Sequence, residues 1–541
     1  MPPRRVGWSG SGPGVRRIGR TVSNLPASET CGTGTRSPAS SRGGHDGRFA
    51  DPYCPMIGQP DKFRRRSNRR AGDGAPRTVQ SLDTEAVAIL GHMFLVGTQR
   101  INDAGHLEIG GCDTVTLARH FETPLYVFDE ADIRDRCRTY RAAFESRYPH
   151  VTIAYAGKAF LTPAMARLID EEGFDLDVAS GGELHVARVA DFPARRLVFH
   201  GNNKSPRELN EALDAGVGRI VLDNDLEIVT LDAAAQARRH CQEVWIRVAP
   251  GVDPHTHRRI RTGQNDTKFG FNITSGAALE AVVKVLGRQG LLFTGLHAHV
   301  GSNLKDMEAH LAALDAVLDL ALAIRDETGL SVEELNLGGG LGIRYLPSDE
   351  VPPVDEFAER LTSALLDGLA SRHLPVPHLH LEPGRSIVGE AGTTLYTVGA
   401  TKSVPIPEAP GHRAFVAIDG GMSDNPRPQL YDAVYSAMIA NRPAAPTTGT
   451  YRVSGKHCET DTLIDDVALA NPQAGDIIAV QSTGAYNHSM ASNYNRLPRP
   501  AVVFVREGTA RLVSRRETYE DLVHLDIGPD DDAGAPVNLP S

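Results

Sequence analysis

A lysine that follows a short apolar run is the first residue of this chain that could carry chemistry. Lys158 comes just after the run Val151–Tyr155, in the segment Tyr-Ala-Gly-Lys-Ala. Partial withdrawal from water lowers the pKa of a lysine amine and lets it form a Schiff base with an aldehyde. Most lysines are solvated surface residues, and position alone leaves both interpretations open.

Glycines and a carboxylate end two later apolar runs. Gly338, Gly339 and Gly340 would let the backbone approach a phosphate and expose its N–H groups, and the N-terminus of a following helix would add a favourable dipole. A tight turn would also explain these glycines. Glu382, in the segment Glu-Pro-Gly-Arg, could hold the ring nitrogen of pyridoxal 5'-phosphate (PLP) protonated, so that the ring withdraws electrons from a substrate Cα. A structural Glu–Arg ion pair is the alternative.

Two histidines and a serine follow another run, in the segment His-Ala-His-Val-Gly-Ser. We expect His297 and His299 to point to opposite faces of a strand, and no carboxylate cluster adjoins them in sequence, so we predict no metal site. His299 is instead expected to lie as a flat ring over the cofactor, with Ser302 donating to its phosphate. The pair His255 and His257 has the same spacing and remains unassigned.

These residues follow short apolar runs that alternate with helix-like segments, a pattern that predicts βα units and a parallel sheet. Eight repeats over roughly 260 residues match a closed (β/α)8 TIM barrel, whose functional groups follow the carboxyl ends of its strands. The predicted strands are Val151–Tyr155, Asp175–Ala179, Leu197–His200, Ile220–Asp223, Val244–Ala249, Phe293–His299, Glu334–Leu337 and His378–Glu382. Predicted helices between them include Pro163–Glu172 and Met307–Thr328.

After about residue 390 the pattern changes to short alternating runs separated by turn residues, which predicts antiparallel strands of a second, all-β domain of sandwich or barrel type. The runs are Thr394–Val398, Ala414–Ile418, Asp476–Gln481, Ala501–Arg506 and Thr509–Ser514. The strand-like segment Met93–Val96 is expected to join them, so that the barrel is inserted within the β domain. The predicted bounds are 125–388 for the barrel, 90–124 plus 389–525 for the β domain, and 526–541 for a flexible C-terminal tail.

Composition argues against several classes of partner. The formal net charge is -10, and outside residues 1–80 the chain holds 42 Lys and Arg against 62 Asp and Glu, so the folded body is acidic and nucleic acid is not expected as its partner. No apolar run approaches the roughly 20 residues of a membrane span. The six cysteines form no CxxC pair, which indicates reduced thiols in a cytoplasmic protein.

Residues 1–80 form a basic tail with 15 Lys and Arg and 5 Asp and Glu, and it is rich in Gly, Ser, Pro and Arg without periodicity. Such a segment buries too little apolar surface to offset the entropy of ordering it, so we predict disorder. We favour the interpretation that the translation start has been assigned too far upstream, and that Met56 or Met93 begins a shorter chain. A transit peptide and a basic nucleic-acid-binding arm are the alternatives.

Seven segments together resemble the alanine-racemase-like, fold-type III PLP enzymes and, among them, the diaminopimelate decarboxylases. In the family's order they cover roughly residues 95–520, and only the combination is specific. The segments are YAGKAF at Lys158, HAHVGSN at His299, LGGGLGI at Gly338, EPGR at Glu382, RPQLY at Arg427, GKHCE at Cys458 and GAYNHSMASNYN at Tyr486.

The resemblance implies a role for each matching residue. Lys158 would carry PLP, His299 would stack on its ring, and Glu382 would meet its pyridine nitrogen. The residues around the phosphate and substrate would be Ser302, Gly338, Gly339, Gly340, Gly384, Arg385 and Tyr486.

The resemblance also implies how the substrate is held. Arg385, Arg427 and Tyr431 would take its distal carboxylate, Glu459 its distal amine, and Cys458 would reprotonate Cα. A bidentate arginine suits a carboxylate, whereas the usual fate of a free cysteine is burial as a small apolar residue. In the family the cysteine and glutamate reach the cofactor from the other subunit, which implies a homodimer with shared active sites.

The implied reaction is decarboxylation of meso-2,6-diaminopimelate to L-lysine and CO2, the last step of lysine biosynthesis. Departures from the family pattern at Asn303, Pro426, Thr460-Asp461 and Asn487-His488 could alter the pocket. A related decarboxylase for ornithine, lysine, arginine or carboxynorspermidine is therefore the alternative. Arg427 argues against it, because a substrate without a distal carboxylate would leave the arginine unpaired.

Two further classes of barrel protein fit the sequence less well. A non-catalytic PLP-binding protein of the same barrel would lack the β domain and Cys458. A sugar- or phosphate-handling barrel would not need Lys158, Glu382 and Cys458 together.

Overall fold

The computed structural model describes residues 94–252, 266–407 and 410–528, which belong to one compact unit of the chain. Several predictions concern residues outside these ranges. They are the N-terminal tail 1–80, Met93, the pair His255 and His257, and the C-terminal tail beyond residue 528.

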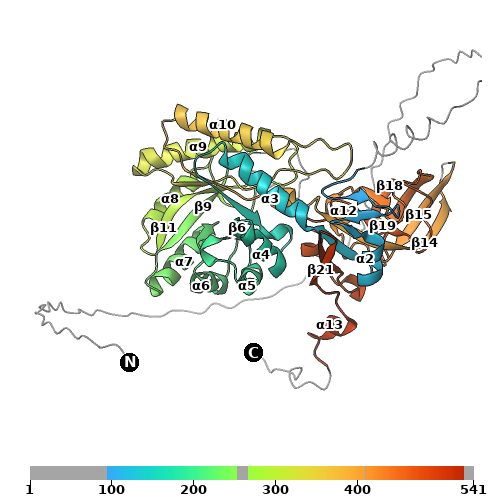
Figure 1. The fold of residues 1–541 in the computed structure, drawn as a ribbon. Coiled ribbons are helices and arrows are strands. Elements are labelled where there is room, and N and C mark those ends of the chain that lie inside the picture. Colours follow the sequence, from blue (N-terminus) through green and yellow to red (C-terminus); the bar gives the residue numbers. More distant parts are fainter. Residues whose placement is uncertain (1–93, 253–265, 408–409, 529–541) are drawn as a thin grey trace, which may run out of the picture. The chain divides into compact units, whose positions relative to one another are not determined.

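Eight parallel strands close into a barrel, as predicted (Figure 1). Each strand pairs with the next along the ring, and β8 closes the circle by pairing with β9. The strands are β5 (Val151–Ala156), β6 (Asp175–Val178), β7 (Leu197–Phe199), β8 (Arg219–Leu222), β9 (Gln242–Ala249), β11 (Leu291–Ala298), β12 (Glu334–Asn336) and β13 (His378–Leu381). The short strand β10 (Phe271–Asn272) pairs with β9 beside the ring.

Helices connect the barrel strands and cover the outside of the ring (Figure 1). They are α3 (Glu130–Glu145), α4 (Pro163–Glu171), α5 (Gly181–Val189), α6 (Pro206–Ala215), α7 (Asp225–Ala237), α8 (Ala277–Leu286), α9 (Glu308–Thr328) and α10 (Val354–Ser371), with the 3-10 turns η1 (Gly157–Ala159) and η2 (Ala194–Arg196). Helix α6 shows how local sequence sets the bounds. Ser205 and Glu208 form a capping box, Pro206 occupies the first turn, and Gly216 ends the helix in the left-handed conformation.

A second sheet is built from the chain on both sides of the barrel. Its strands are β4 (Leu125–Asp129), β14 (Gly392–Pro405), β15 (His412–Ile418), β16 (Ala437–Ile439), β17 (Gly449–Ser454), β18 (Thr462–Leu469), β19 (Ile477–Val480), β20 (Ala501–Arg506) and β21 (Thr509–Ser514). Strand β4 precedes the barrel in sequence and lies between β14 and β20. The barrel is therefore inserted within the β domain, as predicted.

Two expectations for the β domain were wrong. The pairs β4–β20 and β15–β17 are parallel, so the sheet is mixed. Residues 94–96 form no strand, although the Phe94 carbonyl accepts a hydrogen bond from the Gln481 side chain and Leu95 packs on the domain. The strands that do precede the barrel are β1 (Arg100–Ile101), β2 (Leu107–Ile109), β3 (Cys112–Asp113) and β4.

The domain bounds remain a prediction, and β4 favours a barrel that starts after residue 129. Every residue of β4 is buried, so its sequence lacks the alternation of a half-exposed strand and is typical of a barrel strand. The remaining helical elements are α2 (Thr114–Phe121), α11 (Arg385–Val388), α12 (Arg427–Tyr431), α13 (Tyr519–Val523), η4 (His488–Met490) and η5 (Tyr494–Arg496).

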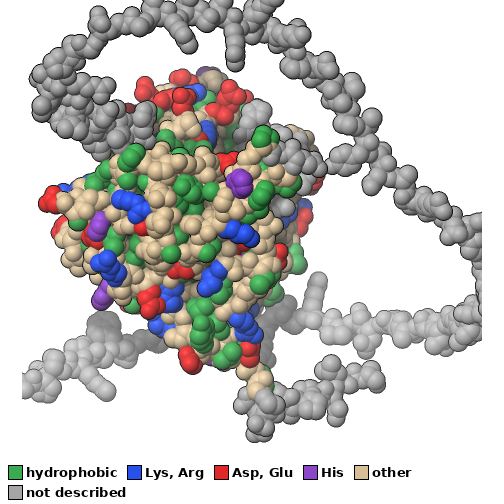
Figure 2. All heavy atoms as spheres, turned by 90° about the vertical axis from the view of Figure 1, so that its right-hand side faces the viewer, with side chains coloured by type: hydrophobic (Ala, Val, Ile, Leu, Met, Phe, Trp, Pro, Cys, Tyr) green, Lys and Arg blue, Asp and Glu red, His purple; other side chains and the backbone are tan. Residues whose placement is uncertain are grey.

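One face of the described surface is mixed in character. Figure 2 shows Lys and Arg side chains lying singly among apolar and uncharged ones on this face rather than in one continuous patch. Among the helices of the described residues, none has the length and apolarity to cross a membrane.

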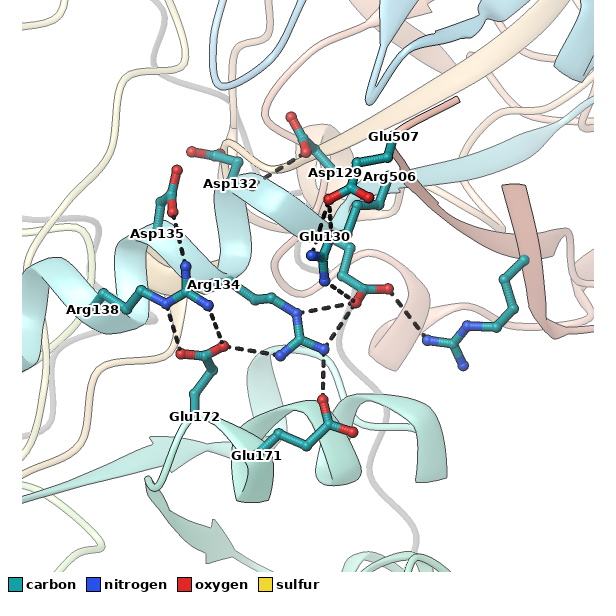
Figure 3. Close-up of polar contacts among 11 residues, drawn as sticks. Asp129, Glu130, Asp132, Arg134, Asp135, Arg138, Glu171, Glu172, Arg506 and Glu507 are labelled. Atoms are coloured by element: carbon teal, nitrogen blue, oxygen red, sulfur yellow. Dashed lines mark hydrogen bonds and ion pairs between the residues drawn. The ribbon is translucent and has the colours of Figure 1, made fainter. Parts of the chain in front are cut away.

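An ion-pair network joins the first barrel helix to its neighbours (Figure 3). Arg134 on α3 contacts Glu130 at 2.9 Å, Glu171 at 2.6 Å and Glu172 at 2.9 Å. Glu130 also contacts Arg511 of β21 at 3.4 Å, so the network ties the barrel to the β domain. Burial alone would raise the pKa of Glu172, but its bonds to arginines hold that pKa below its usual value.

Arg134→Met is expected to lower the free energy of unfolding by about 3 kcal/mol, because it strips a shared partner from two largely buried carboxylates. Arg138→Met is the matched control. Its side chain is 59% exposed and contacts the same Glu172, so it should cost less than about 1 kcal/mol. Urea unfolding of both variants compares them, and equal losses would show that burial does not set the strength of this network.

Candidate active site

A cavity of about 340 Å³ lies at the carboxyl ends of the barrel strands, where the sequence analysis placed the chemistry. Small-molecule sites commonly have this size. The predicted residues that line it are Lys158, His299, Ser302, Glu382, Arg385, Arg427, Tyr431 and Tyr486. The lining residues that were not predicted are Asp177, Ala179, His200, Gly201, Asn202, Arg247, Lys268, Phe269, His297 and Met490.

A small niche adjoins this cavity, and glycines make room for it. Gly339, Gly340 and Gly384 line the niche together with Ser302 and Arg385. A Cβ on Gly339 would lie 2.2 Å from the Glu382 carbonyl oxygen, and one on Gly340, at φ +124, would lie 2.8 Å from the Gly301 carbonyl oxygen. Side chains at these positions would therefore clash with neighbouring backbone, and the hydroxyl and guanidinium groups of the niche fit a phosphate.

The predicted helix dipole is absent from the glycine run. Leu341, which follows Gly340, forms a bridge with Leu304, and the next helix along the chain is α10, which begins only at Val354. The sequence-based expectation was wrong because the chain after the third glycine continues as an extended segment. Any phosphate held here would depend on glycine backbone, Ser302 and Arg385.

Glu382 is the centre of a buried hydrogen-bond network. Its carboxylate lies 2.8 Å from His200 Nε2 and 3.1 Å from His297 Nε2, and Asn336 Nδ2 donates to it at 2.7 Å. Burial alone would raise the pKa of Glu382, but the two histidines hold it well below its ordinary value. An ionised carboxylate at this place can accept a hydrogen bond from a protonated pyridine nitrogen.

The structure corrects the expectation for His297, in β11, and His299, which directly follows this strand. Residues i and i+2 of a strand share one face, and both His297 and His299 line the cavity. Possible ligand atoms of His200, His297 and Glu382 lie within 4.8 Å of one another, as a metal site would need. His200 Nε2 and His297 Nε2 each share a hydrogen bond with the Glu382 carboxylate, at 2.8 and 3.1 Å, so these nitrogens already have a protein partner.

His297 and His299, which both line the cavity, have pKa values below that of an ordinary histidine and are neutral near pH 7. Burial lowers the pKa of His297 to about 4, despite its contact with Glu382. Burial and the nearby Lys158 amine lower the pKa of His299 well below its usual value. Gly339 N donates to His299 Nδ1 at 3.4 Å, and a Cβ on Gly338 would lie 2.7 Å from that same nitrogen, so the glycine run also positions the His299 ring. A neutral ring suits stacking on an aromatic cofactor.

Lys158 lies in the turn η1 after β5, with its side chain exposed to the cavity. Burial by the surrounding protein would lower its pKa, but Tyr486, Asp177 and Glu382 outweigh that effect and raise the pKa above its ordinary value. The expected lowering was therefore wrong in its net direction, because the prediction considered burial alone and missed Asp177.

Two arginines face the cavity without a carboxylate partner in the described part of the chain. Arg385 donates to Ser302 Oγ at 3.1 and 3.0 Å and lies over the Tyr486 ring at 4.7 Å. Arg427 is 4% exposed, its Nε has no hydrogen-bond partner among described residues, and it lies 5.8 Å from the Tyr431 ring centroid. A buried guanidinium without a counter-charge is costly, so this cavity is suited to an anionic ligand.

Cys458 and Glu459 do not line the cavity of their own chain. Both are exposed, in the loop between β17 and β18. The Cys458 N–H donates to Asn495 Oδ1 at 3.0 Å, and the Tyr494 hydroxyl donates to Glu459 Oε1 at 2.5 Å. One chain thus brings together the predicted lysine, glycines, glutamate and arginines, but not the predicted acid.

Sequence reasoning missed several polar residues of the site, and Asp177, His200 and Asn336 are the ones that surround Glu382. Asp177 is the last but one residue of β6, His200 directly follows β7, and Asn336 is the last residue of β12. Burial and the negative charge of Glu382 raise the pKa of Asp177 to about 6, although His200 and Lys158 oppose this. The rule that barrel chemistry follows strand ends could have found all three.

Comparisons with known proteins agree with this geometry. Residues 130–389 match the family described as "Pyridoxal-dependent decarboxylase, pyridoxal binding domain". The diaminopimelate decarboxylase of Bacillus subtilis is 48% identical over 436 residues, which cover 80% of this chain and 98% of the relative. That of Mycobacterium bovis is 44% identical over 79% of this chain and 96% of its own.

A solved structure is similar over the same region. The diaminopimelate decarboxylase from M. jannaschii in co-complex with L-lysine superposes with a TM-score of 0.74 at 34% identity, over 80% of this chain and 98% of that one. The similarity therefore covers about four fifths of this chain and nearly the whole of that one.

Proposed function

The chain belongs to the diaminopimelate decarboxylases, a family of pyridoxal-dependent decarboxylases, and from this premise we propose how its site works. It converts meso-2,6-diaminopimelate to L-lysine and CO2 with PLP as cofactor, in lysine biosynthesis. The observation that carries the substrate assignment is Arg427, a buried cation without a carboxylate partner in the described chain, in the cavity that also holds Lys158.

The residues around the cavity fit PLP. Lys158 would bind the aldehyde carbon through its amine, and the ionised Glu382 would hold the ring nitrogen protonated. His299 would pack on the ring, and the niche of Gly339 and Gly340 would take the phosphate, with Gly338, Gly384, Ser302, Arg385 and Tyr486 around it. When bound, PLP supplies an electron sink for the electron pair left at Cα when CO2 departs.

The arginines would orient the substrate by its distal carboxylate. Arg427 provides the charge, and Tyr431 and Arg385 line the same cavity. Three tyrosine rings lie within 6 Å of the Arg427 guanidinium, so its position is fixed by packing rather than by a carboxylate partner. Fixing the far end of the substrate leaves the other carboxyl group as the one that departs.

We also propose a homodimer with shared active sites. Cys458 and Glu459 are exposed and do not line the cavity of their own chain. This supports a role for both residues in the active site of a second subunit. There Glu459 would hold the distal amine, and the Cys458 thiol would give its proton to Cα. A cytoplasmic location is proposed on the unpaired thiols of Cys112, Cys137, Cys241 and Cys458 among the described residues.

Mixing two inactive variants tests the shared site. Lys158→Ala lacks the cofactor amine of one half-site, and Cys458→Ala lacks the acid of the other, so each homodimer should be nearly inactive. Refolded or exchanged together in equal amounts, they should regain about one quarter of wild-type activity, because half the dimers then contain one intact site. No recovery, with hybrid dimers verified by native mass spectrometry, would place both residues in one subunit's site.

The reaction itself is tested by purified protein reconstituted with PLP. It should release one CO2 per meso-2,6-diaminopimelate and show a visible cofactor band that borohydride reduces onto Lys158. Activity on ornithine, lysine, arginine or carboxynorspermidine in place of diaminopimelate would support the alternative substrate class instead.

A further inference from the structure

The loop that carries Cys458 and Glu459, residues 455–461, is called the acid loop. It is anchored in the domain by two buried side chains, His457 and Asp461. It connects β17 to β18, and the side chains of His457 and Asp461 within it are 0% and 1% exposed. Asp461 Oδ2 lies 2.5 Å from His457 Nδ1 and accepts from His457 N at 3.2 Å. The two exposed residues are thus held between two buried and hydrogen-bonded ones.

The same carboxylate also binds a second loop. Met422 N donates to Asp461 Oδ1 at 2.8 Å, and Met422 lies in the loop between β15 and α12, the helix that begins at Arg427. A Cβ on Gly421 would lie 2.2 Å from Asp461 Oδ2, and one on Gly455 would lie 2.0 Å from it. Two glycines, one in each loop, therefore make room for this carboxylate.

The outer side of the acid loop contacts Tyr494 and Asn495, which belong to a segment that begins at Tyr486 in the cavity. Tyr494 stacks on the His457 ring with centroids 5.9 Å apart, and its hydroxyl donates to Glu459. Asn495 accepts from the Cys458 backbone, and Tyr486, at the start of this segment, lines the cavity. Cys458 and Glu459 are therefore held on both sides of the loop.

A purely structural role explains His457 poorly. Its Nε2 is buried and has no hydrogen-bond partner among the described residues. A buried polar atom without a partner destabilises the fold, and an apolar ring would stack on Tyr494 without that penalty. The imidazole is accounted for by its Nδ1 contact with Asp461.

We propose that Asp461, with His457, is a positioning pair for the decarboxylation. The Asp461 carboxylate fixes the backbone conformation of the loop that presents Cys458 and Glu459. It also binds this loop to the one that leads into Arg427. The inference rests on the proposed function, in which Cys458 is the acid. Because Arg427 lines the cavity of its own chain and Cys458 serves the cavity of the partner, one carboxylate shapes both sites of the dimer.

Asp461→Asn tests the pair in the PLP-loaded enzyme. The amide keeps the shape but turns one acceptor into a donor that faces the Met422 or His457 N–H. We expect kcat to fall about 100-fold with KM changed less than about 3-fold, since a small misplacement of a reacting group has effects of this size. Without substrate, hydrogen exchange in residues 455–461 and iodoacetamide labelling of Cys458, followed by peptide mass spectrometry, should each speed up about 10-fold.

Asp476→Asn is the matched control. Asp476 is a buried aspartate of the β domain that pairs with Arg442, and it contacts neither loop. It should lower the melting temperature without altering kcat or Cys458 labelling. His457→Phe keeps the stacked ring and the backbone hydrogen bond to Asp461 and removes the Nδ1 contact, so it should reproduce the kcat loss if Asp461→Asn does not fold.

Three outcomes would overturn the positioning role. They are an unchanged kcat in Asp461→Asn or His457→Phe, an equal kcat loss in Asp476→Asn, and unchanged exchange and labelling in the acid loop. Failure of the proposed function looks different, because wild-type protein would then release no CO2 from diaminopimelate or Cys458→Ala would keep full activity. The exchange and labelling results would still decide whether Asp461 holds the loop.

Discussion

Lys158→Ala is expected to lower kcat by at least about 1,000-fold, the largest effect of any single substitution in this chain. Lys158 provides the amine that binds the cofactor aldehyde and that must reclaim it when product leaves. Tyr486, Asp177 and Glu382 raise its pKa, and the carboxylates of Asp177 and Glu382 favour the protonated amine. The rate of CO2 release measures the loss, and peptide mass spectrometry after borohydride reduction measures the covalent attachment of PLP.

Lys268→Ala is the matched control for this substitution. Lys268 is the other lysine of the cavity lining, and its amine lies 4.8 Å from the Phe269 ring centroid. It should keep kcat within about 5-fold of wild type, because a solvated amine is readily replaced by water. Turnover by Lys158→Ala, or borohydride labelling of Lys268 in the wild-type protein, would contradict the assignment of the cofactor lysine.

Arg427→Met is expected to lower kcat/KM for meso-2,6-diaminopimelate by about 100- to 1,000-fold, because breaking a buried charge pair costs roughly 2–5 kcal/mol. Methionine keeps the volume among the tyrosine rings but leaves the substrate's distal carboxylate unpaired. Product inhibition separates this effect from general damage. L-Lysine keeps the distal carboxylate and should bind far more weakly, whereas cadaverine has no carboxylate and should bind as it does to wild type.

Arg427→Lys serves as the conservative comparison. It keeps the positive charge and loses the planar fork, so its kcat/KM should lie between those of wild type and Arg427→Met. If Arg427→Met weakened the binding of L-lysine and of cadaverine equally, Arg427 would support the shape of the pocket and would not bind the distal carboxylate.

The barrel could be predicted because its strands are buried on both faces and appear as continuous apolar runs, with the functional residues just after each run. All eight predicted strands are present within two residues of their predicted ends. Strand β4 lies within the predicted bounds of the barrel but pairs with β14 and β20, and sequence could not anticipate this because a fully buried strand has the same pattern in either sheet.

Contacts between distant segments could not be predicted. The ionised state of Glu382 depends on His200 and His297, and the raised pKa of Lys158 depends on Asp177, Glu382 and Tyr486, all from different strands or loops. The opposite-face interpretation of His297 and His299 was an avoidable error, because strand periodicity puts them on one face. Nothing in the spacing of Asp461 indicated that it also binds Met422, which lies 39 residues away.

One product analysis tests the central claim most directly. Wild-type enzyme with PLP is given meso-2,6-diaminopimelate, L-lysine, L-ornithine, L-arginine and carboxynorspermidine together at equal concentrations, and the amines and amino acids formed are identified by mass spectrometry with isotope-labelled diaminopimelate. The account predicts labelled L-lysine in step with CO2 and no cadaverine, putrescine or agmatine. Decarboxylation of any of the other four compounds in preference to diaminopimelate would contradict it.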